Sequence, residues 1–278
     1  MANIGKISTP SFAFNALTGG IALGDVVCIA GDVSSGKTMM LLSFVANSQS
    51  NNLLAAFIDA SDAVQQSAVD YLHIDKNLLY AQSSSPCDAL DTAIFLINNT
   101  SVNFIAIDNL LSIFSSPVDA PTINCIRERL VRLTNAAHKR AVAVAFSITT
   151  EFSPAIWWGD LLGIEDYHLT LQLISSNERQ TISNVLITNY KRCRFTIQTT
   201  LVLQSSLHYN EEIEIFNMAV RLDIIIYKSN GYYYREEYIA AKRRECFIYL
   251  VQNETRLQVL RREVETELKH RLFHLIHH

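Results

Sequence analysis

The stretch that decides the fold is Gly31-Asp32-Val33-Ser34-Ser35-Gly36-Lys37-Thr38. It matches the pattern G-x-x-x-x-G-K-[ST] without substitution, which is the phosphate-binding loop, or P-loop, of nucleoside-triphosphate-binding proteins. Such a loop joins a buried strand to a helix, so that its main-chain N–H groups surround phosphate oxygens. The flanking sequence fits, because the apolar run Val26–Ala30 precedes the loop and a helical segment, Lys37–Ala46, follows it. This context favours a phosphate site over an accidental glycine turn.

The chemistry of the loop residues predicts their roles. Lys37 is expected to reach the β- and γ-phosphates as a catalytic residue, and the Thr38 hydroxyl to bind magnesium. Asp108 follows the mostly apolar strand Val102–Ile107, where P-loop enzymes carry an acid that holds magnesium; the alternative is a turn or cap residue. The sequence thus predicts ATP and Mg²⁺ as cofactors. The expected nucleotide contacts are Gly31, Asp32, Val33, Ser34, Ser35, Gly36, Lys37, Thr38 and Met39.

From about residue 24 to residue 150, short apolar runs alternate with longer helical segments. Fully apolar strands separated by helices predict a parallel sheet that is covered on both faces. The expected strands are Val26–Ala30, Leu53–Ile58, Leu78–Ala81, Val102–Ile107 and Ala141–Phe146. The expected helices are Lys37–Ala46, Ala63–Leu72, Asp88–Ile97 and Ile123–His138.

The pattern changes after residue 165. Three consecutive strands without helices between them predict an antiparallel extension of the sheet, at His168–Ile174, Thr181–Thr188 and Phe195–Leu203. Farther on, Tyr232–Tyr234 is strand-like with at least one ring facing inward, and Glu245–Ile276 is mostly helical. An apolar stripe on this last segment comprises Leu257, Leu260, Val264 and Leu268. We therefore predict an α/β core at residues 1–205 and a small α+β domain at residues 206–278.

Composition narrows the class of protein. Apolar residues make up 49% of the 278 residues and the net charge is −4, so a large core is expected and nucleic acid is not bound through bulk charge. No apolar run is long enough to span a membrane, and the first residues lack the apolar segment of a signal peptide. The five scattered cysteines favour reduced thiols over disulfides or zinc. We expect a cytoplasmic protein without membrane contact.

The residues resemble the bacterial RecA recombinase family over nearly the whole chain. The P-loop and the aromatic hairpin Lys228–Tyr234 carry the specific part of this resemblance, and the helix Asn253–Leu268 follows that hairpin as it does in the family. The more diffuse similarity lies at Ile7-Ser8-Thr9, Leu17–Gly24, Ala56–Ala60, Ile74–Leu79 and Asp88–Leu90. It implies a RecA-like P-loop core with a mainly parallel sheet.

The family forms filaments on single-stranded DNA, hydrolyses ATP between subunits and exchanges strands. The resemblance therefore implies an ATP- and DNA-binding protein of homologous recombination and repair, a DNA-dependent ATPase if it is active. Its two DNA loops fall near Ser115–Thr122 and Thr149–Leu161. Trp157 and Trp158 lie in the second loop and can stack on bases, or instead pack the loop onto the protein. Lys191 matches a lysine that reaches a neighbouring subunit's nucleotide; a solvated hairpin tip is the alternative.

Several positions depart from the family. The catalytic Glu is replaced by Ser61, with Asp62 beside it as the candidate catalytic acid, because a serine hydroxyl cannot serve as a general base. Other family positions are occupied by Ala68, Thr149 and Asn189, and the N-terminal helix and acidic tail are expected to be missing. We therefore predict weakened hydrolysis, with a non-hydrolysing regulator or partner of a recombinase as the rival. A phosphotransferase is a weaker third hypothesis.

Overall fold

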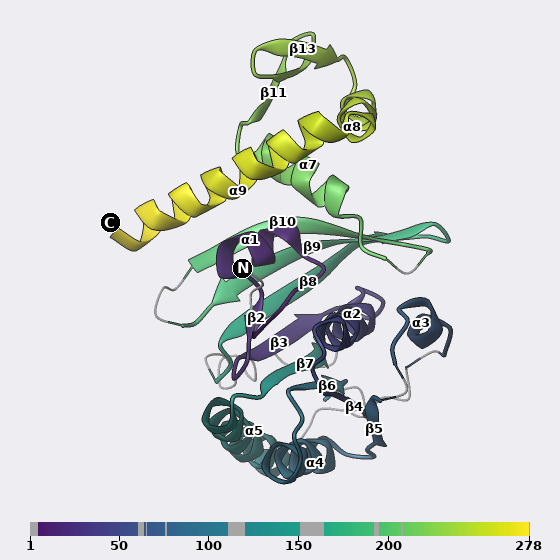
Figure 1. Cartoon of the computed structure of the whole chain (residues 1–278), viewed down its shortest axis with the longest axis vertical. Helices are drawn as coiled ribbons and strands as arrows, with labels where there is room; N and C mark the ends of the chain where they lie inside the picture. Colours follow the sequence, from purple (N-terminus) through teal and green to yellow (C-terminus); the bar gives the residue numbers. More distant parts are fainter. Residues whose placement is uncertain are drawn as a thin grey trace.

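The computed structural model describes residues 5–60, 64, 66–75, 77–110, 120–150, 164–191, 195–206 and 208–277. Figure 1 shows a large twisted sheet with helices on both faces, and above it a smaller C-terminal region crossed by one long helix. The elements through the core are β1 (Lys6–Ile7), α1 (Phe12–Thr18), β2 (Ile21–Ala22), β3 (Val26–Gly31), α2 (Lys37–Ser50), β4 (Ala55–Asp59), α3 (Gln66–Tyr71), β5 (Leu79–Gln82), α4 (Pro86–Asn99), β6 (Phe104–Asp108), α5 (Ala120–Arg140), β7 (Ala143–Thr149), β8 (Tyr167–Ser176), β9 (Gln180–Asn189) and β10 (Phe195–Gln204). The remaining elements are α7 (Glu211–Arg221), β11 (Ile225–Lys228), β12 (Gly231–Tyr234), β13 (Glu237–Ala240), α8 (Arg243–Gln252) and α9 (Glu254–His277).

The main sheet has eight strands in the order β10-β9-β8-β3-β7-β6-β4-β5. Its strands run parallel from β8 to β5, whereas β8, β9 and β10 pair antiparallel. The predicted α/β fold with a mainly parallel sheet and an antiparallel extension is therefore confirmed. Strands β3, β4, β6 and β7 are buried along their full length, as expected for parallel strands that are covered on both faces.

Alternating side chains of the sheet form two cores. On one face, Val27 and Ile29 of β3 pack with α2, which contributes Leu41 and Phe44. On the other face, Cys28 belongs to a second apolar core to which α4 and α5 contribute, and Figure 1 shows these two helices beneath the sheet. Burial of each large apolar side chain stabilises the fold by about 1.5–3 kcal/mol. β3 is thereby fixed in the middle of the sheet, and with it the start of the P-loop.

The C-terminal region builds a third core around the apolar side of α9. Leu260, Val264 and Leu268 are buried and Leu257 is half-buried, so the predicted stripe is confirmed. Tyr234 is buried, as expected for one ring of the strand-like aromatic run. Phe12 and Ala16 of α1 also belong to this core, which shows that an N-terminal helix packs with the C-terminal elements. The domain boundary at residue 205 stays a prediction.

Glu214 on α7 joins three distant segments. Its carboxylate accepts hydrogen bonds from the Ser11 hydroxyl at 2.8 Å, the Phe12 N–H at 2.6 Å and the Ala13 N–H at 3.2 Å. The Thr199 hydroxyl of β10 donates to it at 2.9 Å. Glu214 is fully buried, so its oxygens take the place of water for the first N–H groups of α1. The carboxylate therefore holds α1 against both α7 and the sheet edge.

Burial raises the pKa of Glu214 to about 7, although its four hydrogen bonds oppose this shift. In the unfolded chain a Glu has a pKa near 4.3. Between this pH and pH 7, the folded state therefore binds a proton that the unfolded state does not. The stabilisation that comes from this proton is complete below about pH 4 and is lost as the pH rises through 7. We expect the free energy of unfolding of the wild-type protein to fall between pH 5 and pH 8 by on the order of 3 kcal/mol more than that of Glu214→Gln.

Denaturant titrations at several pH values measure this difference. Glu212→Gln serves as the matched control, because it removes a half-buried carboxylate from the same turn of α7 and should retain the wild-type slope. Parallel curves for wild type and Glu214→Gln would show that Glu214 has no raised pKa in the folded protein.

Candidate nucleotide-binding site

The P-loop lies at a strand-to-helix junction, as the sequence predicts. β3 ends at Gly31 and α2 begins at Lys37, with Gly36 as the residue that precedes the helix. Gly36 has φ +98° and no side chain caps the helix, so the first N–H groups of α2 are available to an anion. A Cβ atom at Gly36 would lie 2.9 Å from the Tyr209 hydroxyl. Glycine is therefore required here for its backbone angle and for space.

The Lys37 side chain is buried beneath the loop. Its ammonium group donates to the main-chain carbonyls of Gly31 at 3.0 Å and Asp32 at 2.6 Å. These bonds draw both ends of the loop together and place a positive charge at the amino end of α2. The helix dipole adds to that charge, which makes this end of the sheet suitable for a phosphate group.

Thr38 and Asp108 meet at the same edge of the sheet. The Thr38 hydroxyl donates to Oδ2 of Asp108 at 2.6 Å, and the Ser147 hydroxyl of β7 donates to Oδ1. Burial raises the pKa of Asp108, while the hydrogen bonds from Ser147 and Thr38 lower it. Hydroxyl and carboxylate oxygens are the ligands that Mg²⁺ prefers, so this pair fits the divalent cation of a bound nucleotide.

A second buried carboxylate lies beside this pair. Asp59 ends β4 and is opposite Asp108 in the parallel β4–β6 ladder. The Tyr80 hydroxyl donates to Oδ2 of Asp59 at 3.0 Å, and the negative charge of Asp59 contributes to the raised pKa of Asp108. Two neighbouring buried acids concentrate negative charge at this corner of the site, and a bound cation would offset the repulsion between them.

The antiparallel extension braces the P-loop from the side. The Asp32 carboxylate accepts a hydrogen bond from the Leu173 N–H at 3.0 Å, and the Ser183 hydroxyl donates to the Ser35 carbonyl at 3.0 Å. The Tyr209 hydroxyl donates to the Gly36 carbonyl at 2.8 Å. Sequence reasoning missed Ser183 and Tyr209, because they belong to no local motif and lie far from the loop along the chain.

The other predicted loop contacts are spread between core and surface. Val33 is 49% exposed, Met39 is half-buried and Ser34 has φ +62°. Ser35 is buried, and its hydroxyl has no hydrogen-bond partner among the described residues. The structure thus brings the whole Gly31–Met39 segment and Asp108 together, and their donors and acceptors fit Mg·ATP. Their roles toward the nucleotide stay predictions.

The remaining predicted site residues are not brought into this group. Lys191 forms an ion pair with Asp25 of the same chain, and its ammonium lies 5.2 Å from the centre of the Tyr167 ring. Asp62, Trp157 and Trp158 lie outside the described residues, as do Ser61 and most of both predicted DNA loops. Thr149, the expected switch position, accepts a hydrogen bond from the Asn109 side chain.

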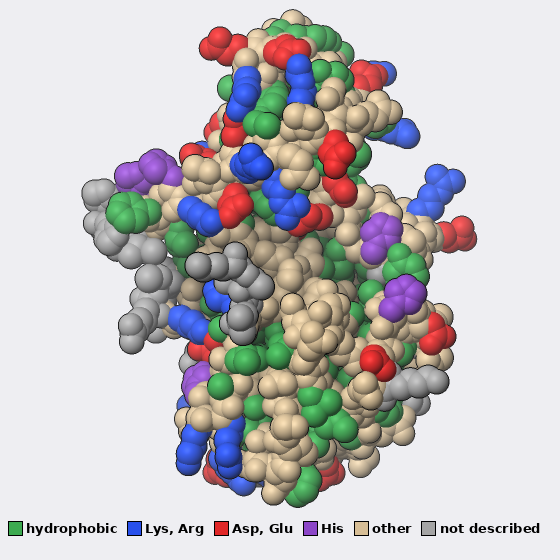
Figure 2. All heavy atoms as spheres, viewed as in Figure 1, with side chains coloured by type: hydrophobic (Ala, Val, Ile, Leu, Met, Phe, Trp, Pro, Cys, Tyr) green, Lys and Arg blue, Asp and Glu red, His purple; other side chains and the backbone are tan. Residues whose placement is uncertain are grey.

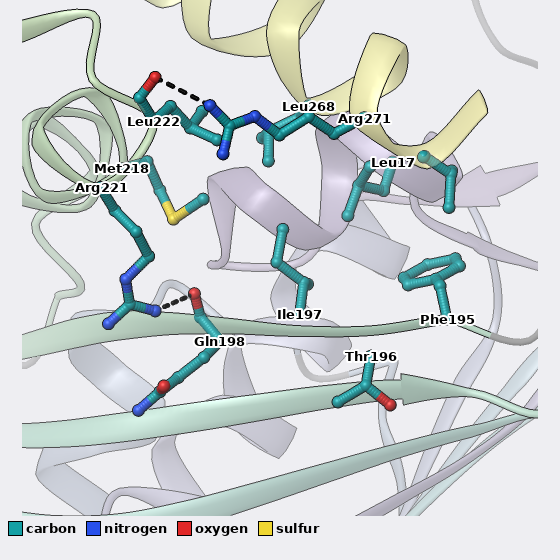
Figure 3. Close-up of a pocket in the computed structure, with 11 residues that line it drawn as sticks. Leu17, Phe195, Thr196, Ile197, Gln198, Met218, Arg221, Leu222, Leu268 and Arg271 are labelled. Carbon is teal, nitrogen blue, oxygen red and sulfur yellow. Dashed lines mark hydrogen bonds between the residues drawn. The ribbon is translucent and has the colours of Figure 1, made fainter. Parts of the chain in front are cut away.

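A separate pocket of about 380 Å³ lies between the C-terminal region and the sheet edge. Figure 3 shows Leu17, Ile197 and Met218 facing it, with Arg221 and Arg271 each bonded to a main-chain carbonyl. No P-loop residue lines this pocket, so it is distinct from the phosphate site. In the view of Figure 2, acidic and basic side chains are interspersed over the C-terminal elements.

The fold and the loop define an α/β P-loop protein, with a nucleotide-type phosphate loop at the end of a central parallel strand. The family model described as RecA N-terminal domain matches residues 1–119. Protein RecA of Legionella pneumophila (strain Corby) is 24% identical over 302 aligned residues, which cover 96% of this chain and 84% of that protein. The chain is thus similar to RecA proteins over nearly its whole length, at low sequence identity.

Other relatives align over a shorter part of the chain. Protein RecA of Rubrobacter xylanophilus is 34% identical over 113 residues, which cover 40% of this chain and 33% of that protein. Protein RecA of Acidothermus cellulolyticus is 36% identical over 115 residues, again 40% of this chain and 33% of that protein. The higher identity over the shorter alignments shows that the similarity is uneven along the chain. Among the described residues, no helix is long and apolar enough to cross a membrane.

We expect Gly36→Ala to weaken ATP binding by roughly tenfold or more, or about 1.4 kcal/mol. The added methyl group strains a positive φ, at a cost of about 1–2 kcal/mol, and displaces the Tyr209 hydroxyl from the loop. Gly24→Ala is the matched control, because Gly24 has φ +96° but no atom nearer than 3.7 Å to an added Cβ. It should lose similar stability and bind ATP as the wild type does.

Titration calorimetry and thermal unfolding of both variants separate these effects. The double variant Gly36→Ala, Tyr209→Phe should regain part of the lost affinity, because it removes the hydroxyl that the methyl group meets. Equal loss of affinity in the Gly24 and Gly36 variants would contradict a local role for the loop.

Proposed function

We propose that this protein binds Mg·ATP at the P-loop and acts on single-stranded DNA in homologous recombination and repair, with weakened ATP hydrolysis. The observation that carries the proposal is the Thr38–Asp108 hydrogen bond at the end of the P-loop. It places a hydroxyl and a carboxylate side by side where a P-loop protein holds the magnesium ion of its nucleotide. The DNA part of the proposal rests on the similarity of the chain to RecA proteins.

Each binding group has a distinct task. The N–H groups of the loop and of the first turn of α2 donate to phosphate oxygens, and the Lys37 ammonium, which contacts loop carbonyls in the structure, turns toward the anion. Thr38 and Asp108 would hold Mg²⁺, which supplies positive charge against the charge that develops on the phosphates. Tyr209 holds the Gly36 carbonyl and keeps the adjacent N–H groups directed at the site.

Hydrolysis needs an additional group that activates water. The family's Glu position is Ser61 in this chain, and serine is no general base at neutral pH. Asp62 is the candidate substitute, and Asp59 is a buried acid near the magnesium pair that already accepts a hydrogen bond from Tyr80. Because nucleotide binding uses none of these groups, we propose that binding is retained while turnover is slow.

A second candidate is a nucleotide-binding regulator that does not hydrolyse ATP and associates with a recombinase. The specific observation in its favour is Lys191, which forms an ion pair with Asp25 of its own chain. The family resemblance assigns this lysine to a neighbouring subunit's nucleotide. A lysine occupied within its own subunit must give up that pair to reach across an interface, which disfavours assembly into an active filament.

Turnover with and without single-stranded DNA distinguishes the two candidates. We expect the wild-type protein to bind ATP with magnesium and to hydrolyse it slowly, with faster turnover on DNA. Lys37→Ala should abolish both activities, because the loop loses its only buried ammonium donor among the described residues. Lys139→Ala on the exposed end of α5 is the charge-matched control and should leave both unchanged. Tight ATP binding without turnover under either condition would favour the regulator.

The two tryptophans of the chain are adjacent, at Trp157 and Trp158, so intrinsic tryptophan fluorescence reports on the predicted second DNA loop alone. We expect a single-stranded oligonucleotide to quench this fluorescence at low salt, because base stacking contributes about 1–3 kcal/mol per base. Replacement of both tryptophans by alanine should weaken oligonucleotide binding in a mobility-shift assay, whereas replacement by phenylalanine should preserve most of it. Unchanged fluorescence together with no mobility shift would contradict DNA binding by this loop.

A further inference from the structure

Two cysteines face each other across the helix pair beneath the sheet. Cys87 lies in the first turn of α4, and Cys125 lies on the second turn of α5. Their sulfur atoms are 3.1 Å apart, which is within contact distance. Both side chains are half-buried, so a small reagent in solvent can reach them. By contrast, Cys28 and Cys246 are buried.

An arginine is positioned against one of these two sulfurs. Nη1 of Arg129 lies 2.7 Å from Sγ of Cys125, one helical turn away on α5. Nε of the same guanidinium donates to the Asp91 carboxylate at 2.9 Å, so α4 holds the arginine in place. This contact places a positive charge beside the Cys125 sulfur, where it stabilises the charge that develops when that sulfur reacts as a nucleophile.

The environment of the Cys87 sulfur differs from that of the Cys125 sulfur. Burial and the hydrogen bond to Cys125 raise the pKa of Cys87 to about 11, so this thiol keeps its proton at neutral pH. Either sulfur can be the donor in the contact between the two thiols, but it is the Cys125 sulfur that accepts a hydrogen bond from Arg129, which makes Cys125 the nucleophile of the pair. The contacts therefore give the two cysteines different roles, with Cys125 as the attacking sulfur and Cys87 as the resolving thiol.

We propose that Cys87 and Cys125 form a peroxide-reactive site, at which a hydroperoxide converts the two thiols into a reversible disulfide between α4 and α5. In the first step the Cys125 thiolate attacks the distal oxygen of the hydroperoxide, the O–O bond breaks, and the leaving alkoxide takes up a proton. Cys125 is then a sulfenic acid. In the second step the Cys87 sulfur attacks Cys125, and the sulfenic hydroxyl leaves with the Cys87 proton as water.

The overall change is balanced, because two thiols lose two electrons and two protons while the hydroperoxide is reduced to an alcohol and water. A shift of about 1 Å between the two sulfurs completes the S–S bond, whose ideal length is near 2.05 Å. The new bond would tie the first turn of α4 to α5. A cross-link over that span of sequence stabilises a fold chiefly by restricting the unfolded chain.

Oxidation of the full-length protein by hydrogen peroxide tests the proposal. After remaining thiols are blocked with N-ethylmaleimide, peptide mass spectrometry without reductant should find Cys87 and Cys125 joined, with two of the five cysteines protected from the reagent. Dithiothreitol should restore both thiols. The midpoint of thermal unfolding should rise by several degrees in the oxidised protein.

Single substitutions test the order of events. Cys87→Ser should stop at a Cys125 sulfenic acid that dimedone traps, whereas Cys125→Ser should give no dimedone adduct at Cys87. Arg129→Gln should slow oxidation by roughly tenfold, whereas Arg127→Gln, an exposed arginine on the same helix, should leave the rate unchanged. Circular dichroism confirms that each variant is folded.

Several outcomes would overturn the proposal. They are a disulfide that joins any other pair of cysteines, a dimedone adduct that forms first at Cys87, and equal oxidation rates for wild type and Arg129→Gln. Formation of the Cys87–Cys125 bond only after denaturation would likewise rule out a site built by the folded protein.

Discussion

The hydrogen bond between Thr38 and Asp108 depends on the topology of the sheet, and the candidate site depends on this bond. Thr38 opens the helix after β3, and Asp108 ends β6, which is separated from β3 by β7 alone. Because parallel strands end at the same edge of a sheet, side chains that are 70 residues apart come within hydrogen-bond distance. Ser147 of the intervening strand donates to the same carboxylate, so donors from two other segments converge on one acid.

The burial of these acids side by side has an electrostatic cost. A buried carboxylate without compensation is unfavourable, and Asp108 has Asp59 beside it as well. Two hydroxyl donors and the nearby Lys37 ammonium compensate in part, yet burial still raises the pKa of Asp108. Two acids lie together in the interior, next to a loop that suits phosphate. A divalent cation would stabilise this arrangement of charges.

The sequence predicts the core because its strands are buried on both faces, which leaves continuous apolar runs such as Ala55–Ile58. It also predicts the P-loop, whose spacing is a chemical requirement. It does not reveal α1, which has only seven residues and whose first N–H groups are satisfied by Glu214, about 200 residues away. Nor does it reveal that Tyr209 and Ser183 brace the loop, because such contacts exist only after β8, β9 and β10 have added to the sheet.

In the proposed function, nucleotide binding and hydrolysis use different groups, so one can be kept while the other weakens. In the proposed function, affinity for a triphosphate comes from main-chain N–H groups, one ammonium and two oxygen ligands, and Lys37, Thr38 and Asp108 are held by hydrogen bonds in the structure. Water activation requires a carboxylate beyond β4, where the sequence has Ser61 and then Asp62. In the proposed function, a substitution there raises the barrier to chemistry and leaves the binding contacts in place, so kcat falls while affinity stays constant. The braces from Ser183 and Tyr209 stabilise the loop conformation independently of that chemistry, which is why a chain selected only for nucleotide-dependent binding would retain them.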